Sequence, residues 1–260
     1  TQFGDSPAFE GGNPDVKKVK PSQEKVRRFL YFKEEFMETN LSRIVCRAVR
    51  AVGIIKPQFD PQKRNFMPPQ LRVDGTGFWL KKQEAFITCA HVIQNILGAS
   101  IEVAGMLVVG GNGVEYRKAT ISIIDFVHDL AILHIEADKA YLDAQVATGL
   151  EIADRKLNIA DQVAYAGFPF GNELLNSKHS ATYSEGVVGS EILEDTLPKT
   201  IQISGSVAGG YSGGPIVLKD EPSKVIAVLS HSPSKEVGNA SIFKGIHWKH
   251  LKKLFDLINS

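Results

Sequence analysis

The sequence predicts an all-β protein organised as two β-units, with a helix before the first unit and another after the second. Short segments rich in Val and Ile recur along the chain, separated by the turn-forming residues Gly, Pro, Asn and Asp. Regularly spaced short strands of this kind form sandwiches or barrels. One less apolar segment, residues 141–154, interrupts the pattern and divides the strands into two groups.

The predicted strands share a short length and a high content of β-branched residues. In the first group they are residues 43–55, 75–80, 85–88, 101–109, 118–126 and 131–135, and in the second 162–165, 181–188, 200–203, 215–219, 225–229 and 241–246. The four prolines among residues 56–69 predict a loop. The run Gly110-Gly111-Asn112-Gly113 joins two strands and lacks the lysine of a phosphate-binding P-loop, so we predict a β-hairpin there.

A helix is predicted over residues 22–38. After Pro21, the apolar residues Val26, Phe29, Leu30 and Phe36 recur at helical spacing. Because such stripes usually pack against a core, we expect this helix to dock on the body; the alternative is that it binds a regulatory protein partner.

The two ends of the chain complete the predicted domain division. Residues 1–20 contain few large apolar side chains and predict a flexible tail. Residues 248–258 place apolar side chains on one helical face and predict a closing helix. We therefore expect a tail and helix at 1–40, a first β-unit at 41–145, and a second β-unit with the closing helix at 146–260.

Composition excludes several classes of function. The net charge is +1, which gives no electrostatic reason to expect nucleic acid or a membrane surface as the main partner. The sequence has no apolar run of membrane-spanning length and no hydrophobic signal core. Cys46 and Cys89 are too few for a disulfide framework and form no zinc motif, so buried thiols and a cytoplasmic location are expected. Since Thr1 is not an initiator Met, a removed leader, and with it a periplasmic or secreted protein, stays open.

The most informative stretch is V-A-G-G-Y-S-G-G-P-I-V at residues 207–217. Ser212 is flanked by four glycines, which mark a turn that few side chains can enter. Acyl transfer needs such a turn, because a nucleophilic hydroxyl must stand exposed while nearby backbone amides face the oxyanion that it creates. Taken alone, the stretch is equally consistent with an ordinary hairpin turn.

Two upstream motifs decide between these interpretations. Residues 88–92 are T-C-A-H-V, with His91 just past an apolar strand, and residues 128–133 are H-D-L-A-I-L, with Asp129 just before one. Alone, His91 is typical of a core histidine and Asp129 of a turn residue. Together with Ser212 they supply a base, an orienting carboxylate and a nucleophile, each at the edge of a strand.

This set of motifs resembles the chymotrypsin/trypsin-like serine peptidases over residues 41–254. The approach to the histidine, Gly75-Thr76-Gly77-Phe78, is similar to that of the family, and residues 167–171, G-F-P-F-G, resemble its bacterial HtrA-like branch. The resemblance implies two six-stranded antiparallel β-barrels and a serine endopeptidase that needs no cofactor and no metal.

The resemblance also implies a role for each site residue. Ser212 would attack the carbonyl carbon, His91 would take the serine proton, and Asp129 would hold the histidine tautomer. The backbone amides of Gly210 and Ser212 would form the oxyanion hole.

Three departures from the family pattern are informative. Tyr211 stands where zymogen-type members have an aspartate that pairs with a new N-terminus, and Val92 stands where a disulfide cysteine would follow the histidine. No stretch for a PDZ module follows Leu254. These departures predict a stand-alone, reduced, non-zymogen member whose substrate is a protein or peptide.

The resemblance places the specificity pocket around the segments that flank the serine turn. Ser206 would lie at its base, and Ser230, His231 and Ser232 would lie along one side. Neither segment supplies an acid at the base, so we expect uncharged, small to medium residues at the cleavage position. The alternative is that His231 turns into the pocket and selects an acidic residue.

Competing functions fit the sequence less well. The G-x-S-x-G pattern around Ser212 also occurs in α/β-hydrolases, but there a helix follows the serine, whereas here the strand-forming Pro-Ile-Val-Leu follows. His247 and His250 lie three apart on a predicted helix without a Cys or acidic partner, so solvated positions are expected rather than a metal site. A catalytically silent or partner-gated interaction protein on the same scaffold remains the alternative function, although all three triad residues are present.

Overall fold

A computed structural model of the chain describes residues 40–60, 62–98, 106–169, 180–192, 200–231 and 242–258. The predicted tail at 1–20 and the predicted helix at 22–38 lie outside these residues, as does Ser232 of the predicted pocket. The compact unit that contains all of the described residues is Thr39–Ser260.

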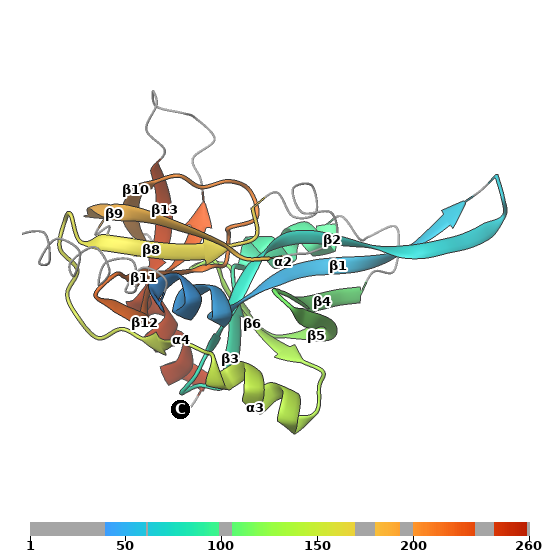
Figure 1. Cartoon of the computed structure of the whole chain (residues 1–260), viewed down its shortest axis with the longest axis horizontal. Coiled ribbons are helices and arrows are strands. Elements are labelled where there is room, and N and C mark those ends of the chain that lie inside the picture. The colour runs from blue at the N-terminus through green and yellow to red at the C-terminus, as the bar shows by residue number, and fades with distance from the viewer. Residues whose placement is uncertain are drawn as a thin grey trace, which may run out of the picture. The chain divides into compact units, whose positions relative to one another are not determined.

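The first half of this unit is a closed barrel (Figure 1). Its strands follow the order β1-β2-β3-β6-β5-β4 around the barrel, and every pairing is antiparallel. The strands are β1 (Val49–Asp60), β2 (Asn65–Leu80), β3 (Ala85–Thr88), β4 (Met106–Gly111), β5 (Val114–Asp125) and β6 (Leu130–Ile135).

The second half is a seven-stranded sheet in the order β11-β8-β9-β10-β13-β12-β7. Strand β11 also pairs with β12, so the six strands from β11 to β12 in this order close into a ring. Strand β7 lies outside this ring and pairs with β12 in parallel. The strands are β7 (Glu151–Ile152), β8 (Gln162–Gly167), β9 (Thr182–Ile192), β10 (Thr200–Gly205), β11 (Pro215–Leu218), β12 (Glu221–His231) and β13 (Ile242–His247). The predicted all-β fold with two β-units is confirmed.

The two halves share a continuous apolar core. The larger hydrophobic cluster fills the first barrel with side chains such as Phe78 and Phe86 and continues into Val217 and Val228 of the second half. A short backbone link joins the halves, because Leu150 donates to the carbonyl of Trp79 at 2.9 Å. A site that is formed by residues from both halves requires such contact, because the contact holds those residues at fixed positions.

The predicted helix at the end of the chain and the predicted hairpin are both present. Helix α4 covers Trp248–Ile258, as expected from its apolar spacing. Asn112 and Gly113 connect β4 to β5 as a two-residue turn with φ of 57° and 80°. Such positive φ values are typical of an Asn-Gly hairpin.

Residues 43–48 are helical, so the predicted strand beginning at residue 43 was wrong over its first part. The described part of this first helix is residues 40–48, and β1 follows directly at Val49. Leu41, Val45 and Ala48 are buried at helical spacing. Val and Ile promote strands on average, but here the burial of one helical face outweighs that preference.

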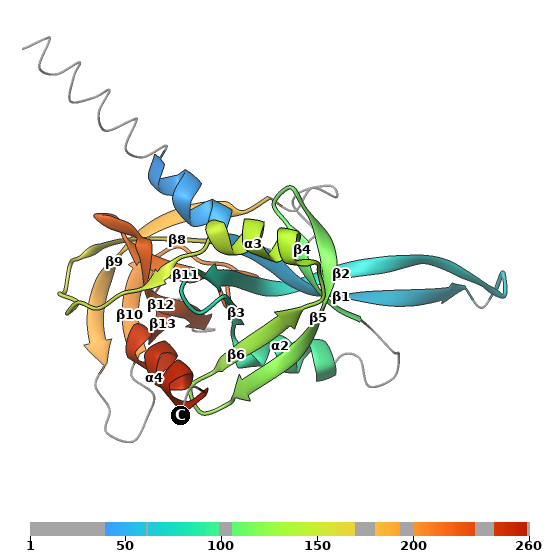
Figure 2. The ribbon, with the colours of Figure 1, turned by 90° about the horizontal axis from the view of Figure 1, so that it is seen from below.

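The predicted loop at residues 56–69 was also wrong, because β1 and β2 continue through it as a long hairpin (Figures 1 and 2). The pairing skips Pro57, resumes with Gln58 opposite Met67, and leaves Pro68 and Pro69 outside the ladder. Proline cannot donate to a ladder, but it is tolerated at a bulge and on edge strands. A two-stranded ribbon consists of two edges, which is why its prolines did not prevent strand formation.

The expectation that helices occur only at the ends of the strand region was wrong as well. Helix α2 (Ala90–Gly98) follows β3, and helix α3 (Lys139–Ala147) lies in the predicted connector. In α2, Val92, Ile93 and Ile96 are buried on one face. The carboxylate of Asp138 caps α3 by accepting from the amide of Tyr141 at 2.8 Å.

Candidate active site

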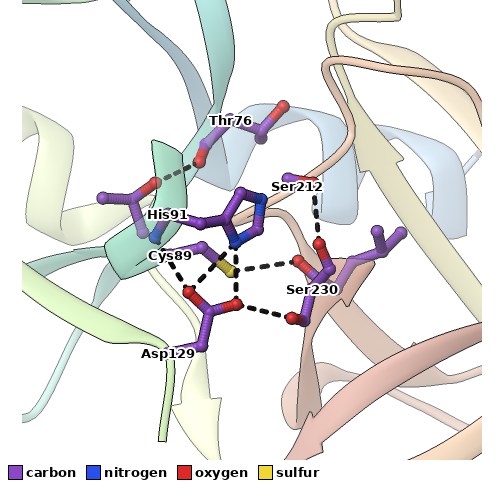
Figure 3. Close-up of polar contacts among 8 residues, drawn as sticks. Thr76, Cys89, His91, Asp129, Ser212 and Ser230 are labelled. Atoms are coloured by element: carbon purple, nitrogen blue, oxygen red, sulfur yellow. Dashed lines mark hydrogen bonds and ion pairs between the residues drawn. The ribbon is translucent and has the colours of Figure 1, made fainter. Parts of the chain in front are cut away.

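His91 and Asp129 form a close pair at one end of the first barrel (Figure 3). His91 lies in the first turn of α2, and Asp129 lies in the turn between β5 and β6. Nδ1 of His91 is 2.8 Å from Oδ2 and 3.0 Å from Oδ1 of Asp129. The backbone amide of His91 also donates to Oδ1 at 2.9 Å, so ring and main chain are bound to one carboxylate.

The environment of Asp129 favours its ionised form. Burial acts to raise the pKa of this carboxyl, but hydrogen bonds from His91 and Ser230 and the charge of His91 outweigh it, so the pKa lies below its usual value. The residue has a φ of 54°, a conformation that Asp tolerates better than most side chains. An ionised Asp129 accepts hydrogen bonds only.

The charge of Asp129 fixes the tautomer of neutral His91. Because the carboxylate is an acceptor, Nδ1 of His91 carries the proton and donates it to Asp129. Nε2 then presents its lone pair. Figure 3 shows the imidazole between Asp129 and Ser212, so this lone pair belongs to the side of the ring nearer the serine.

Ser212 lies between β10 and β11, in the second half of the fold. Its hydroxyl donates to the carbonyl oxygen of Ser230 at 2.8 Å, and its own carbonyl accepts from the amide of Thr76 at 2.8 Å. Ser230 in turn donates from Oγ to Asp129 at 2.5 Å. The three predicted catalytic residues are thus brought to one place, with Ser230 bridging Ser212 and Asp129.

We call residues 206–214 the serine loop, and two of its glycines are required by its geometry. Gly213 has a φ of 88°, and a Cβ there would lie 2.0 Å from the Thr76 carbonyl oxygen and 2.4 Å from Oγ1 of Thr88. Gly210 has a φ of 102° and is followed by Tyr211, whose amide donates back to Ala208 at 3.4 Å. A positive φ at the third position of a turn is the signature of type II, which requires glycine.

A model of the trypsin-like peptidase domain matches residues 75–228, more than half of the chain. The match begins within β2, ends within β12, and includes His91, Asp129 and Ser212. The chain belongs to the trypsin-like peptidases.

Two curated relatives match part of this trypsin-like peptidase at low identity. An "Uncharacterized protein y4bJ" of Sinorhizobium fredii is 31% identical over 157 residues, which are 60% of this chain and 21% of that protein. A protein of Arabidopsis thaliana named "Putative protease Do-like 3, mitochondrial" is 26% identical over 171 residues, which are 62% of this chain and 27% of that protein. The chain therefore spans about a quarter of the length of the curated relatives that it matches.

The four residues predicted to line the specificity pocket of this trypsin-like peptidase do not share one environment. Ser206 is exposed, and its carbonyl accepts from the Tyr165 hydroxyl at 2.8 Å. Ser230 turns its hydroxyl to Asp129. His231 is the last residue of β12, and Ser232 lies outside the described residues. Of the two whose side chains the structure describes, Ser206 and Ser230, the hydroxyl of Ser230 is hydrogen-bonded to a predicted catalytic residue.

Tyr211 is a buried, uncharged residue of the serine loop. Its side chain is buried, its hydroxyl shares a 2.8 Å hydrogen bond with Oγ of Ser184, and its ring packs edge-on against Tyr165. Burial raises the pKa of Tyr211 more than the bond from Ser184 lowers it. The residue is therefore uncharged at neutral pH, in agreement with the expectation that it makes no ion pair.

One group of side chains has the composition of a metal site. Among the described residues, ligand atoms of Cys89, His91 and Asp129 lie within 4.8 Å of one another. Burial, followed by the negative charge of Asp129, holds the pKa of the Cys89 thiol well above its usual value. The protonated thiol donates to the Leu229 carbonyl at 3.3 Å. The hydrogen bonds of the described residues thus engage all three side chains, the Cys89 thiol with Leu229 and His91 with Asp129.

The expected solvated positions of His247 and His250 were wrong. Both side chains are buried. His250 lies in α4, whereas His247 is the last residue of β13. The ring of His250 stacks on His128 with centroids 4.3 Å apart, and Nδ1 of His247 accepts from the amide of Lys249 at 3.2 Å. Packing against neighbouring residues thus accounts for both histidines.

Two contacts of the site were not predicted from the sequence. Ser230 was assigned to the pocket, whereas its hydroxyl binds Asp129. Thr76 was noted only within Gly-Thr-Gly-Phe, whereas its hydroxyl binds the serine loop. In the described part of the chain, no helix has the length and apolarity needed to cross a membrane.

Proposed function

We propose that this chain is a serine endopeptidase in which Ser212, His91 and Asp129 act as nucleophile, base and orienting carboxylate. The observation that carries the proposal is the position of the His91 ring, which is bound to Asp129 through Nδ1 and lies between that carboxylate and Ser212. The trypsin-like peptidase domain supports the same class of reaction.

The first chemical step forms an acyl-enzyme. The Ser212 hydroxyl turns from the Ser230 carbonyl towards Nε2 of His91, which takes its proton as the oxygen attacks the substrate carbonyl carbon. The carbonyl π electrons move onto the substrate oxygen. The amides of Gly210 and Ser212 donate to this oxyanion, and each such donor contributes about 3 kcal/mol in comparable enzymes.

Collapse of the tetrahedral intermediate breaks the C–N bond, and the leaving amine takes the proton from His91. Water then attacks the acyl-enzyme with His91 as base, and a second collapse releases the carboxylic acid and restores the Ser212 hydroxyl. Asp129 remains ionised throughout, because its hydrogen bonds hold its pKa low, and it stabilises the charge that His91 carries between the steps.

The proposal is tested by the variant Ser212→Ala on a fluorogenic peptide library. Ser190→Ala is the matched control, since Ser190 is also half-buried and its hydroxyl donates to Gln202 at 3.0 Å, away from the site. We expect the wild-type protein and Ser190→Ala to cleave peptides and Ser212→Ala to be inactive with an unchanged unfolding midpoint.

A fluorophosphonate probe locates the nucleophile independently. Mass spectrometry of the labelled protein should place the probe on Ser212 and nowhere in Ser212→Ala. Label on another residue, or full turnover by Ser212→Ala, contradicts the mechanism. A wild-type protein that neither cleaves peptides nor takes the label would instead support the silent or partner-gated scaffold.

A further inference from the structure

Thr76 of the first barrel holds the serine loop of the second half through two hydrogen bonds. Its amide donates to the Ser212 carbonyl at 2.8 Å, and its hydroxyl donates to the Gly210 carbonyl at 2.6 Å. The two acceptors are two residues apart, so one residue of β2 holds both ends of the segment Gly210-Tyr211-Ser212. Figure 3 shows Thr76 on the same side of His91 as Ser212.

The Thr76 hydroxyl has a single orientation. It carries one hydrogen, and its oxygen already accepts a hydrogen bond from the amide of Phe168 at 3.1 Å. The hydrogen is therefore directed to the Gly210 carbonyl. The Thr76 main chain is fixed too, because its carbonyl accepts from Oγ1 of Thr88 at 2.7 Å within the barrel. The residue is fully buried, so water does not compete for these bonds.

Gly210 needs an external restraint of this kind. A glycine populates positive and negative φ about equally, so no side chain of its own keeps Gly210 at 102°. The bond that closes its turn, from the Tyr211 amide to the Ala208 carbonyl, is long at 3.4 Å. The 2.6 Å bond from Thr76 is the shorter restraint, and it fixes the plane of the peptide that follows Gly210.

We propose that Thr76 is the positioning residue of the serine loop: its hydroxyl holds the peptide that follows Gly210, and through the restrained backbone of Gly210 it sets the direction of the Gly210 amide, in the preceding peptide, towards the developing oxyanion. This inference rests on the proposed peptidase function. Catalytic donors contribute most when their direction is set before the reaction, and a displacement of about 1 Å can lower a rate by about 10². Thr76 acts through Gly210 and does not touch the substrate.

The test compares three variants of the full chain. Thr76→Val keeps the shape and removes the hydroxyl, and Thr76→Ser keeps the hydroxyl and removes the methyl group. Thr148→Val is the matched control, because Thr148 also donates a side-chain hydrogen bond to a backbone carbonyl, that of Gln145 at 2.8 Å, at the end of α3. If Thr76→Val does not fold, Thr76→Ala replaces it under the same criteria.

In peptide hydrolysis, we expect Thr76→Val to lower kcat by about 10² with KM changed less than about threefold. Thr76→Ser should restore kcat to within about fivefold of wild type, since it supplies the same donor. Thr148→Val should match wild type in both constants. A kcat for Thr76→Val within about twofold of wild type would overturn the inference, as would an equal loss in Thr76→Ser, which would assign the effect to packing.

Amide hydrogen exchange tests the same inference without activity. Peptides that cover residues 206–214 should exchange faster in Thr76→Val than in wild type, and at the wild-type rate in Thr76→Ser and Thr148→Val. If wild type cleaves no peptide, the proposed function fails and the exchange result alone decides the role of Thr76. Unchanged exchange in Thr76→Val would then overturn it, and faster exchange confined to the serine loop would support it.

Discussion

The hydroxyl of Ser230 donates to Oδ2 of Asp129 over 2.5 Å, although the two residues are 101 positions apart in the chain. Asp129 belongs to the first barrel and Ser230 to β12 of the second half, so this bond crosses between them. Together with the bond from His91, it gives the carboxylate side-chain donors from both halves.

Removing this bond should slow the reaction without preventing binding. In Ser230→Ala, Asp129 loses one donor, so its pKa rises towards the ordinary value and its carboxylate is held less firmly beside His91. A hydrogen bond to a charged group contributes about 1.5 kcal/mol, which corresponds to about tenfold in rate. Steady-state kinetics should show this loss in kcat, with KM almost unchanged. A wild-type kcat in Ser230→Ala would remove the bond from the mechanism.

Asp129→Asn tests the tautomer of His91. The amide can donate to Nδ1, which leaves the proton on Nε2 and removes the base that Ser212 needs. In a well-studied triad of this kind the same change lowers kcat by about 10⁴, and we expect a similar loss here. Asn also tolerates the positive φ of this position, so the fold should be retained. A loss of less than about tenfold in kcat would exclude Asp129 from the proposed triad.

The low pKa of Asp129 predicts a specific dependence of stability on pH. A carboxyl whose pKa is lower in the folded than in the unfolded state stabilises the fold above its unfolded pKa. This contribution is lost as the pH falls through the pKa of Asp129 in the folded state, which lies below the ordinary value of 3.8. Urea unfolding of wild type and Asp129→Asn should therefore give a stability difference that shrinks as the pH falls below about 4. A difference that continues to grow as the pH falls below about 4 would contradict the ionised Asp129.

We predict cleavage after uncharged residues of small to medium size. The Ser206 side chain is neutral, and the hydroxyl of Ser230 is used by Asp129. Glu185 is an acidic residue near Ser206, because the Tyr165 hydroxyl donates to the backbone carbonyls of both residues. The carboxylate of Glu185 already forms an ion pair with Lys219 at 2.6 Å. Profiling with a peptide library measures the preference directly. Dominant cleavage after Arg or Lys would refute this prediction, and dominant cleavage after Asp or Glu would assign selection to His231.

Activity should not depend on a new N-terminus. Tyr211 is uncharged and bound to Ser184, and the serine loop is held by Thr76, which belongs to the barrel itself. A version of the chain that begins at Thr39, the start of the compact unit, should therefore cleave peptides at the rate of the full chain. An increase of about a hundredfold or more on truncation would identify residues 1–38 as an inhibitory segment, and loss of folding would place them in the core.

The strands that carry the site could be predicted because most of their side chains are apolar. Residues 85–88, 131–135 and 215–218 are largely or entirely buried, and a continuous apolar run has the same appearance whatever it packs against. The closing helix α4 was predicted at its observed bounds, because an amphipathic stripe is a local pattern. The proximity of His91, Asp129 and Ser212 was predicted from the family motifs, because no local sequence pattern connects the three residues.

Errors arose where tertiary contacts outweighed local preference. Val92, Ile93 and Ile96 are β-branched and typical of strands, yet they cover one face of α2. Pro57 and Pro68 are typical of loops, yet they lie within a hairpin whose pairing passes around them. The bond from Thr76 to Gly210 spans 134 positions, and no local pattern in either segment indicates the other.

This separation of 134 positions also orders events while the chain is being made. Synthesis proceeds from the N-terminus, so β1 to β6, with Thr76, His91 and Asp129, leave the ribosome before Ser212 is translated. The nascent first barrel thus contains the proposed base and its carboxylate before the proposed nucleophile has been made. The serine loop gains its restraint only when the later strands have docked, and pairings between distant segments form slowly. Under the proposed function, the chain could therefore not cleave a neighbouring nascent chain until the strands that follow Ser212 have docked on the first barrel.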